Sequence, residues 1–175
     1  MTAELEQRLQ GVRLLTCDVD GVLTDGRVYF DDDGRESKAF FAPDGTGLMM
    51  LMRAGVAVAW ITGSSAPAVA HRARRLGVAH VIQGSDDKLP RWRALIAQLG
   101  ISPAACAHMG DDLADLPVMR ASAVALTVPH APEVLHRHAH YVTARAPGSG
   151  AVREVCELIL AAQGQLAAAH SWFGA

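Results

Sequence analysis

The polar residues best suited to chemistry in this chain stand directly after apolar stretches. In LLTCDVDGVLTDG, residues 14–26, an apolar run ends on two carboxylates, Asp18 and Asp20, which are one residue apart and precede Gly21. Three later segments carry polar groups at comparable points: Thr62 in WITGSS, Lys88 in GSDDK, and Asp111, Asp112 and Asp115 in HMGDDLAD. If the apolar stretches are parallel strands, their carboxyl ends meet at one edge of a sheet, and these side chains form a single site.

A group of aspartates needs a positive partner. Without one, the carboxylates repel each other and one of them takes up a proton. A divalent cation removes this cost, and a set made only of oxygen ligands favours Mg²⁺ over zinc. Mg²⁺ commonly combines one or two carboxylates with a substrate phosphate. Lys88 offers a compact positive charge for such a phosphate, while the Thr62 hydroxyl and the backbone N–H groups that follow it, including that of Gly63, can bond its oxygens.

A structural explanation exists for each aspartate taken alone. Aspartates at strand ends serve turns and helix caps, and Asp111 or Asp112 would suit the start of a helix over 113–121. The combination of DVDGVLT, TG, a lysine and GDDxxD in this order favours catalysis instead. A thiolate phosphatase is excluded, because its loop needs an arginine six residues after the cysteine, and the residues found there are Leu23, Asp112 and Ala162.

The elements that must position these residues follow a βα rhythm. Short runs rich in Val and Ile, without in/out alternation, are typical of strands covered on both faces. They occupy 12–19, 56–62, 79–83, 105–110, 123–128 and 140–143. Helical patterns separate most of them, at 66–76, 88–99, 113–121, after Pro132 and within 149–163. This order predicts an α/β fold with a doubly wound parallel sheet.

One segment interrupts the rhythm. GRVYFDDDGRESKAFF, residues 26–41, has two β-prone arms around a polar turn, which predicts a hairpin inserted between the first strand and the first helix. Its arms, VYF and AFF, are too hydrophobic for an isolated hairpin exposed to water, so we expect them to be buried against copies of the chain. We interpret 1–175 as one domain, with a tail over about 164–175 that is frayed or partner-dependent.

The composition limits the partners. The net charge is −2 and the basic residues are scattered, so no basic stripe indicates binding to nucleic acid or to an anionic membrane. No apolar stretch reaches the roughly 18–20 residues that span a bilayer, and the first residues lack the apolar centre of a secretory signal. We therefore expect a cytoplasmic protein. The three cysteines, Cys17, Cys106 and Cys156, form no CxxC motif and are predicted core residues.

Two further patterns invite interpretation. HRHAH, residues 136–140, would place its three histidines on one side if it were extended, as a metal site requires. We favour a solvated edge, because no second ligand cluster accompanies the histidines. Trp60 lies in a predicted strand and is expected in the core, whereas Trp92 fits either the core or an oligomer contact.

The four polar segments resemble, in order and spacing, the four motifs of the haloacid dehalogenase superfamily of phosphohydrolases. The resemblance implies a Rossmann-like fold and Mg²⁺-dependent hydrolysis through an aspartyl-phosphate. Asp18 matches the family's nucleophile, and Asp20 matches its general acid and base; a two-residue spacing lets one turn aim both at phosphorus. Thr62 and Lys88 match catalytic residues that also bind the phosphate. The resemblance further implies that Mg²⁺ binds the Asp18 carboxylate, the Asp20 backbone carbonyl and Asp111. Asp112 and Asp115 would lie just outside these ligands.

Many members of the superfamily carry a cap domain, for which this chain has no room. From about Leu14 to Gln163 the capless chain, with its hairpin, resembles the 3-deoxy-D-manno-octulosonate 8-phosphate phosphatases. This resemblance implies a phosphorylated sugar acid as substrate and a role in lipopolysaccharide biosynthesis. It also implies a homotetramer, in which four hairpins form a central barrel and each C-terminal segment reaches a neighbouring site.

Departures from that family concern the substrate. Pro43, Ser64 and Ser149 stand where the family usually has basic residues, whereas Arg72 keeps a position used near the substrate. Loss of arginine partners for a carboxylate should weaken affinity or change the substrate. One alternative is a phosphatase for the nine-carbon 2-keto-3-deoxy sugar acid 9-phosphate, a family that also lacks arginine after TG. Another is a non-catalytic binding module. A receiver domain is disfavoured, because it has no carboxylate corresponding to Asp20.

Overall fold

The computed structural model describes residues 2–172 and 174, which form a parallel sheet between layers of helices. The six strands follow the order β5-β4-β1-β6-β7-β8, and every neighbouring pair is parallel. Their bounds are β1 (Leu14–Cys17), β4 (Ala57–Ile61), β5 (His80–Ile82), β6 (Cys106–Gly110), β7 (Val124–Thr127) and β8 (Tyr141–Val142). The doubly wound α/β fold is confirmed, and all six predicted strands are present.

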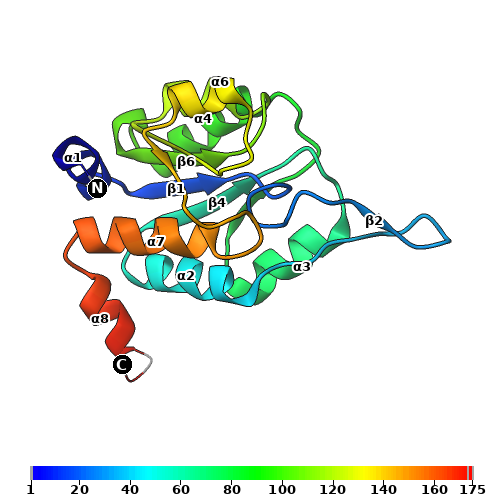
Figure 1. Cartoon of the computed structure of the whole chain (residues 1–175), viewed down its shortest axis with the longest axis horizontal. Coiled ribbons are helices and arrows are strands. Elements are labelled where there is room, and N and C mark those ends of the chain that lie inside the picture. Colours follow the sequence, from blue (N-terminus) through cyan, green and yellow to red (C-terminus); the bar gives the residue numbers. More distant parts are fainter. Residues whose placement is uncertain (1, 173, 175) are drawn as a thin grey trace.

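Helices cover both faces of the sheet (Figure 1). On one face lie α2 (Ala42–Arg53), α3 (Pro67–Leu76) and α7 (Ala151–Ala162), and on the other α4 (Lys88–Leu99) and α5 (Leu116–Ala121). The remaining helices are α1 (Ala3–Gln10), the short η1 (Pro103–Ala105), α6 (Glu133–His138) and α8 (Leu166–Ser171). Because both faces are covered, all four residues of β1 are buried, as its apolar sequence predicts.

Close packing of α2 against α7 explains the sequence DGTG at 44–47. A Cβ on Gly47 would lie only 3.0 Å from the Arg153 Cα atom, so glycine lets the two helices approach. Asp44 is buried, and its carboxylate accepts the backbone N–H groups of Arg153 at 2.8 Å and Gly150 at 3.4 Å at the start of α7. This segment of α2 therefore holds α7 against it on one face of the sheet.

The predicted hairpin is present and extends away from the body of the molecule (Figure 1). Its strands β2 (Tyr29–Phe30) and β3 (Glu36–Ser37) are antiparallel, and the Val28 and Phe30 side chains before the turn are exposed. The second arm departs from the expectation that both apolar arms are buried against copies of the chain. The Phe40 ring stacks on buried Trp60 with 6.1 Å between ring centroids, so this arm packs onto the core of its own chain.

The tail is more ordered than the sequence predicts. Residues 166–171 form α8, Ala169 is fully buried, and the Arg53 guanidinium lies 5.6 Å from the centre of the Trp172 ring. Up to Trp172 the tail is therefore not frayed, because small alanine side chains let α8 pack closely against α7 and α2. The alternative, that the tail depends on a partner, stays a prediction. Residues 173 and 175 of that prediction lie outside the described part of the chain.

Trp60 and Trp92 are both fully buried, and Trp92 packs in the core between α4 and the sheet. The three cysteines are free and buried, as predicted. Over residues 2–172 and 174, no helix combines the length and the apolar character needed to cross a membrane.

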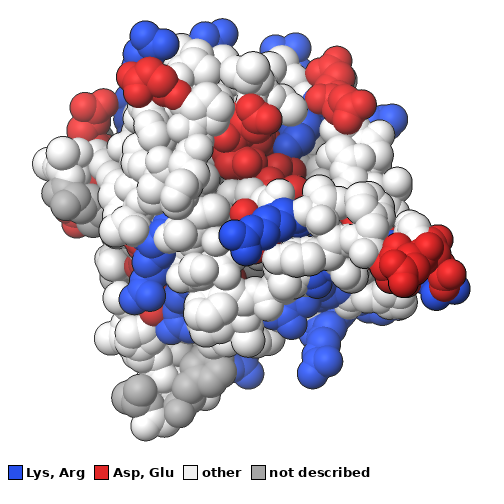
Figure 2. All heavy atoms as spheres, turned by 45° about the vertical axis from the view of Figure 1, so that its right-hand side comes forward, with Lys and Arg blue, Asp and Glu red and all other residues white. Residues whose placement is uncertain are grey.

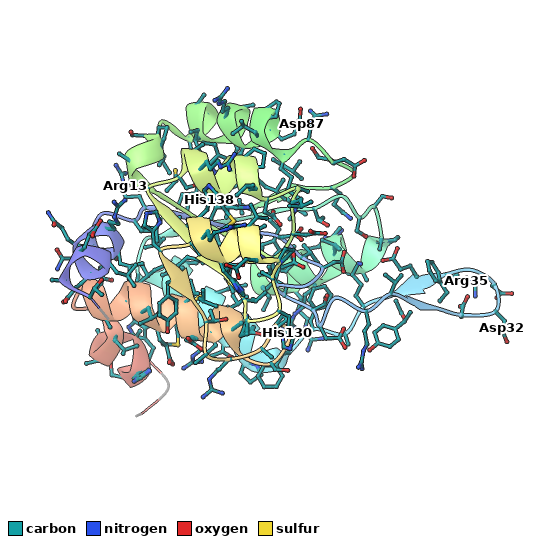
Figure 3. The ribbon with its side chains drawn as sticks, turned by 45° about the horizontal axis from the view of Figure 1, so that its top comes forward. Arg13, Asp32, Arg35, Asp87, His130 and His138 are labelled. Atoms are coloured by element: carbon teal, nitrogen blue, oxygen red, sulfur yellow. The ribbon has the colours of Figure 1, made fainter. Side chains whose placement is uncertain are left out.

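The three histidines of HRHAH do not assemble a metal site. His136 contacts the Val128 carbonyl oxygen at 3.1 Å, while His140 Nδ1 accepts the Ala125 backbone N–H at 2.9 Å. His138 is exposed on α6 (Figure 3) and lies 3.0 Å from an Arg120 nitrogen. Because α6 turns the first two histidines in different directions, the extended arrangement considered for a metal does not occur.

Candidate active site

The carboxyl ends of β1, β4 and β6 meet at one edge of the sheet, where an open cleft of about 350 Å³ is found. Four predicted segments deliver residues to it: Asp18 and Asp20 after β1, Thr62 and Gly63 after β4, Lys88 at the start of α4, and Asp111, Asp112 and Asp115 after β6. Figure 2 brings this edge forward and shows acidic side chains gathered in a hollow with basic ones beside them. Distant segments of the sequence therefore meet as predicted.

Lys88 joins two aspartates at the floor of the cleft. Its Nζ lies 2.8 Å from the Asp18 Oδ1 atom and 2.8 Å from the Asp115 Oδ1 atom, and its side chain is only 4% exposed. Burial alone would lower the pKa of Lys88, but the charges of Asp115 and Asp18 outweigh it and raise that pKa. Lys88 is therefore a fixed ammonium group beside the predicted nucleophile.

Asp115 is the most heavily bonded carboxylate of the site. Besides Lys88, it pairs with His108 Nε2 at 3.0 Å, and it accepts the backbone N–H groups of Asp111 at 3.2 Å and Asp112 at 3.4 Å. Burial raises its pKa, but His108 and Lys88 together lower it below the ordinary value. Asp115 thus holds the β6 loop and Lys88 in place, while the exposed Asp112 carboxylate accepts the N–H of Leu113 at 2.7 Å.

His108 is a buried part of this site that sequence analysis missed. Its Nδ1 lies 2.8 Å from the Thr16 hydroxyl and its Nε2 lies 3.0 Å from Asp115, so the ring bridges β1 to the β6 loop. In the tautomer with the proton on Nε2, the ring donates to the carboxylate and accepts from Thr16. The signal available was a histidine at an inward position of a buried strand, where a polar side chain needs partners.

Asp111 carries the clearest sign of a missing partner. Its Oδ1 atom is buried and has no hydrogen-bond partner within the described residues. Burial, followed by the charges of Asp18 and Asp115, raises the pKa of Asp111 from 3.8 to about 8. Gly21 makes room for this carboxylate: its φ is +85°, and a Cβ there would collide with Asp111 Oδ2.

Three neighbouring aspartates, two of them buried and one partly buried, fit a divalent cation. Asp18, Asp111 and Asp115 can each present a carboxylate oxygen, and these atoms all lie within 4.8 Å of one another. The donors are hard oxygens, which Mg²⁺ prefers. Since Asp115 already binds Lys88 and His108, the orphaned oxygen of Asp111 and the carboxylate of Asp18 are the side-chain ligands this arrangement favours.

Asp20 has partners that sequence analysis also missed. Lys38, one residue beyond β3, donates to Asp20 Oδ1 at 2.6 Å and Oδ2 at 2.8 Å, and to Glu36 Oε1 at 2.6 Å. Burial lowers the pKa of Lys38, but these two carboxylates more than compensate and raise it. The sequence signal was weak, because Lys38 lies in a polar stretch of the hairpin, where a side chain exposed to solvent is expected.

The residues near Thr62 form the other side of the cleft. The Thr62 hydroxyl is buried and accepts the Ser64 backbone N–H at 3.1 Å, while Gly63 is exposed to the cleft. Arg72 does not line this cleft within the chain: its guanidinium lies over the Phe40 ring at 6.0 Å. The predicted catalytic residues are therefore brought together, and Arg72 stands apart from them.

Comparisons with known proteins agree with this geometry. Residues 71–155 match the model of a haloacid dehalogenase-like hydrolase family. The 3-deoxy-D-manno-octulosonate 8-phosphate phosphatase KdsC of Yersinia pestis is 46% identical over 160 residues, which cover 91% of this chain and 86% of that protein. KdsC of Escherichia coli K12 is 43% identical over 166 residues, covering 95% and 88% of the two chains. The chain belongs to the 3-deoxy-D-manno-octulosonate 8-phosphate phosphatase family.

A solved member of this phosphatase family is closely similar in structure. The enzyme from Moraxella catarrhalis, in complex with magnesium, phosphate and KDO, superimposes with a TM-score of 0.96 at 42% identity, covering 99% of each chain. The positions where this chain departs from the family's usual basic residues are spread out. Ser64 lies at the cleft, whereas Pro43 lies in the first turn of α2 and Ser149 is exposed just before α7.

Proposed function

We propose that this chain is a Mg²⁺-dependent phosphatase acting on 3-deoxy-D-manno-octulosonate 8-phosphate in lipopolysaccharide biosynthesis. The observation that carries the proposal is the placement of Asp18 beside Lys88 and near the unpartnered Oδ1 atom of Asp111, in the cleft that also contains Asp20. The activity of the KdsC relatives supplies the substrate class.

In this proposal the reaction has two displacements. An Asp18 oxygen attacks phosphorus, the bond from phosphorus to the sugar oxygen breaks, and Asp20 gives the leaving oxygen a proton. Water then attacks the aspartyl-phosphate, Asp20 takes the proton of that water, and the bond to Asp18 breaks to release phosphate. Asp20 is thus restored to its protonated form at the end of the cycle.

The other residues hold the phosphoryl group. Lys88, the Thr62 hydroxyl and the Gly63 backbone N–H supply positive charge and hydrogen bonds to its oxygens. Mg²⁺, held by the Asp18 and Asp111 carboxylates and the Asp20 backbone carbonyl, would offset the charge that develops on the phosphoryl oxygens. Asp115 keeps Lys88 in place, and Asp112 lies at the rim.

The identity of the sugar acid is the finer part of the proposal. Ser64 at the cleft cannot provide the bidentate contact that an arginine makes to a carboxylate. The test compares kcat/KM for the eight-carbon 8-phosphate with that for the nine-carbon 2-keto-3-deoxy 9-phosphate, both with Mg²⁺. A higher value for the nine-carbon compound would replace the proposed substrate. A complete lack of phosphate release from either sugar phosphate and from an aryl phosphate would favour a non-catalytic binding module.

We also propose that the chain acts as a cytoplasmic homotetramer built from one domain over 1–175. The exposed Val28 and Phe30 side chains, 57% and 67% accessible, favour burial of the hairpin between copies. Three free thiols suit a reducing compartment. A neighbour would complete each pocket, with Arg72 and the segment near Ser149 as candidate contributors.

Light scattering tests the assembly directly. Phe30→Glu should give a smaller species with impaired turnover of the sugar-acid phosphate and better retained hydrolysis of a small aryl phosphate. Phe40 is unsuitable for this test because it packs on Trp60, so its replacement would damage the fold. A fully active monomer of the unmodified chain at micromolar concentration would contradict the shared pocket.

A further inference from the structure

The use of lysine in this chain is unusual. Its sequence contains only two lysines, Lys38 and Lys88, and all its other basic side chains except histidine are arginines. Lys88 lines the cleft and Lys38 binds Asp20, which also lines it, and the two lysine side chains are only 4% and 2% exposed. Lysine differs from arginine in carrying a compact point charge on a flexible stem instead of a planar guanidinium. The chain thus has an ammonium group at each of the two aspartates predicted to react.

All three donors of the Lys38 ammonium are used by the site. Two bind the two oxygens of Asp20, at 2.6 and 2.8 Å, and the third binds Glu36 Oε1 at 2.6 Å. Glu36 in turn lies 3.5 Å from the Ser64 hydroxyl on the opposite side of the cleft. The contacts therefore connect the loop after β1, the hairpin and the loop after β4.

Asp20 has little else to fix its side chain. Apart from Lys38, its carboxylate contacts only the Thr24 hydroxyl, at a long 3.4 Å, among the described residues. The Asp20 side chain is 29% exposed, so it can turn toward water when Lys38 does not hold it. A general acid that is misplaced by about 1 Å can lose on the order of 100-fold in rate.

We propose that Lys38 is a positioning residue, which holds the Asp20 carboxylate toward the reacting phosphoryl group and so makes the hairpin a working part of its own chain's active site. Glu36 keeps the ammonium of Lys38 on Asp20 and away from the phosphate, which is left to Lys88. Because Lys38 immediately follows β3, displacement of the hairpin displaces Lys38 and with it Asp20. This inference rests on the proposed phosphatase function.

The experiment compares Lys38→Met, Lys38→Arg and a matched control, Arg35→Met. Arg35 belongs to the same hairpin but is exposed at its tip, paired with Asp33 at 2.9 Å (Figure 3). With an aryl phosphate and Mg²⁺, Lys38→Met should lower kcat roughly 10- to 100-fold and change KM less than about threefold. Lys38→Arg should recover part of the loss, because a guanidinium can also bind both carboxylate oxygens. Arg35→Met should stay within about twofold of the unmodified protein.

A double-mutant cycle with Asp20→Asn separates positioning from a general structural effect. If Lys38 acts through Asp20, adding Lys38→Met to Asp20→Asn should cause no further loss in the rate of phosphoenzyme formation. Losses that multiply, or a Lys38→Met kcat within about threefold of the unmodified protein, would overturn the inference. Thermal unfolding of each variant checks the fold, and Glu36→Gln, expected to lower kcat more mildly, provides a second reading if Lys38→Met does not fold. Inactivity of the unmodified protein would refute the proposed function instead.

Discussion

Asp111 is expected to reduce the stability of the metal-free protein. Its replacement should therefore raise the stability of the fold while removing a ligand needed for function. Its carboxylate is enclosed beside Asp18 and Asp115, with one oxygen lacking a partner. Asp111→Asn keeps the shape of the side chain and removes the charge. Its amide can also donate to the Asp18 carboxylate. We therefore predict a more stable protein in chelator that no longer responds to Mg²⁺.

The pKa shift of Asp111 gives the sign and the size of this effect. Its pKa is 3.8 ordinarily and about 8 in the folded chain, so between these values the folded state holds a proton that the unfolded state has lost. Stability in chelator therefore falls as pH rises from about 4 to 8, and the full cost is present above 8. At about 1.4 kcal/mol per unit, the shift corresponds to at most about 6 kcal/mol.

The measurement is thermal unfolding in chelator at pH 6 and pH 9. Local rearrangement and entry of water reduce the cost of a buried charge, so we expect Asp111→Asn to recover about half of that value at pH 9. For a chain of this length, about 3 kcal/mol raises Tm by roughly 6–12 °C. The gain should be smaller at pH 6, where Asp111 is largely protonated. Mg²⁺ should raise the Tm of the unmodified protein but not that of the variant.

Asp112→Asn is the matched control. Asp112 is the next residue and carries the same charge, but it is exposed, and among the described residues its carboxylate bonds only the backbone N–H of Leu113. Its replacement should leave Tm nearly unchanged at both pH values. Equal Tm values for Asp111→Asn and the unmodified protein at pH 9 in chelator would refute the argument from burial and repulsion. An undiminished Mg²⁺ response in Asp111→Asn would refute the assignment of Asp111 as a ligand.

Three further predictions address catalysis and the buried network. Asp18→Asn and Asp20→Asn should each abolish turnover without unfolding the protein, and Asp20→Asn should retain phosphorylated enzyme detectable by mass spectrometry. If Asp18→Asn keeps activity within about tenfold of the unmodified protein, Asp18 is not the nucleophile. Chelator should stop hydrolysis, Mg²⁺ should restore it and Ca²⁺ should inhibit, since Ca²⁺ takes a looser, higher coordination; full activity in excess chelator would count against a metal site. His108→Phe removes a partner from buried Asp115, so it should cost about 1–3 kcal/mol and lower both Tm and kcat, and an unchanged Tm would show that His108 does not support Asp115.

Much of the fold was predictable because its signals are local. The apolar runs that end on Asp18, Thr62 and Asp111 are strands in the structure, and their parallel order places those residues at one sheet edge. The helix predicted over 66–76 is α3, which begins at Pro67 and is closed by Gly77 in the left-handed conformation. The hairpin was visible from its polar turn. The ordering of α8 was not, since it depends on burial of Ala169 by other helices.

The sequence by itself determined which stretches are strands and the chemical character of the site, because both follow from residue types and short spacings along the chain. Only the tertiary structure decided which charged side chains pair with each other and which of them are buried. Lys38 meets Asp20 across 18 residues, and Lys88 meets Asp115 across 27. Likewise, the buried environment of Asp111 is created by Asp18 and Gly21 on another strand's loop. Burial and charge act through distance in space, which residue spacing does not specify.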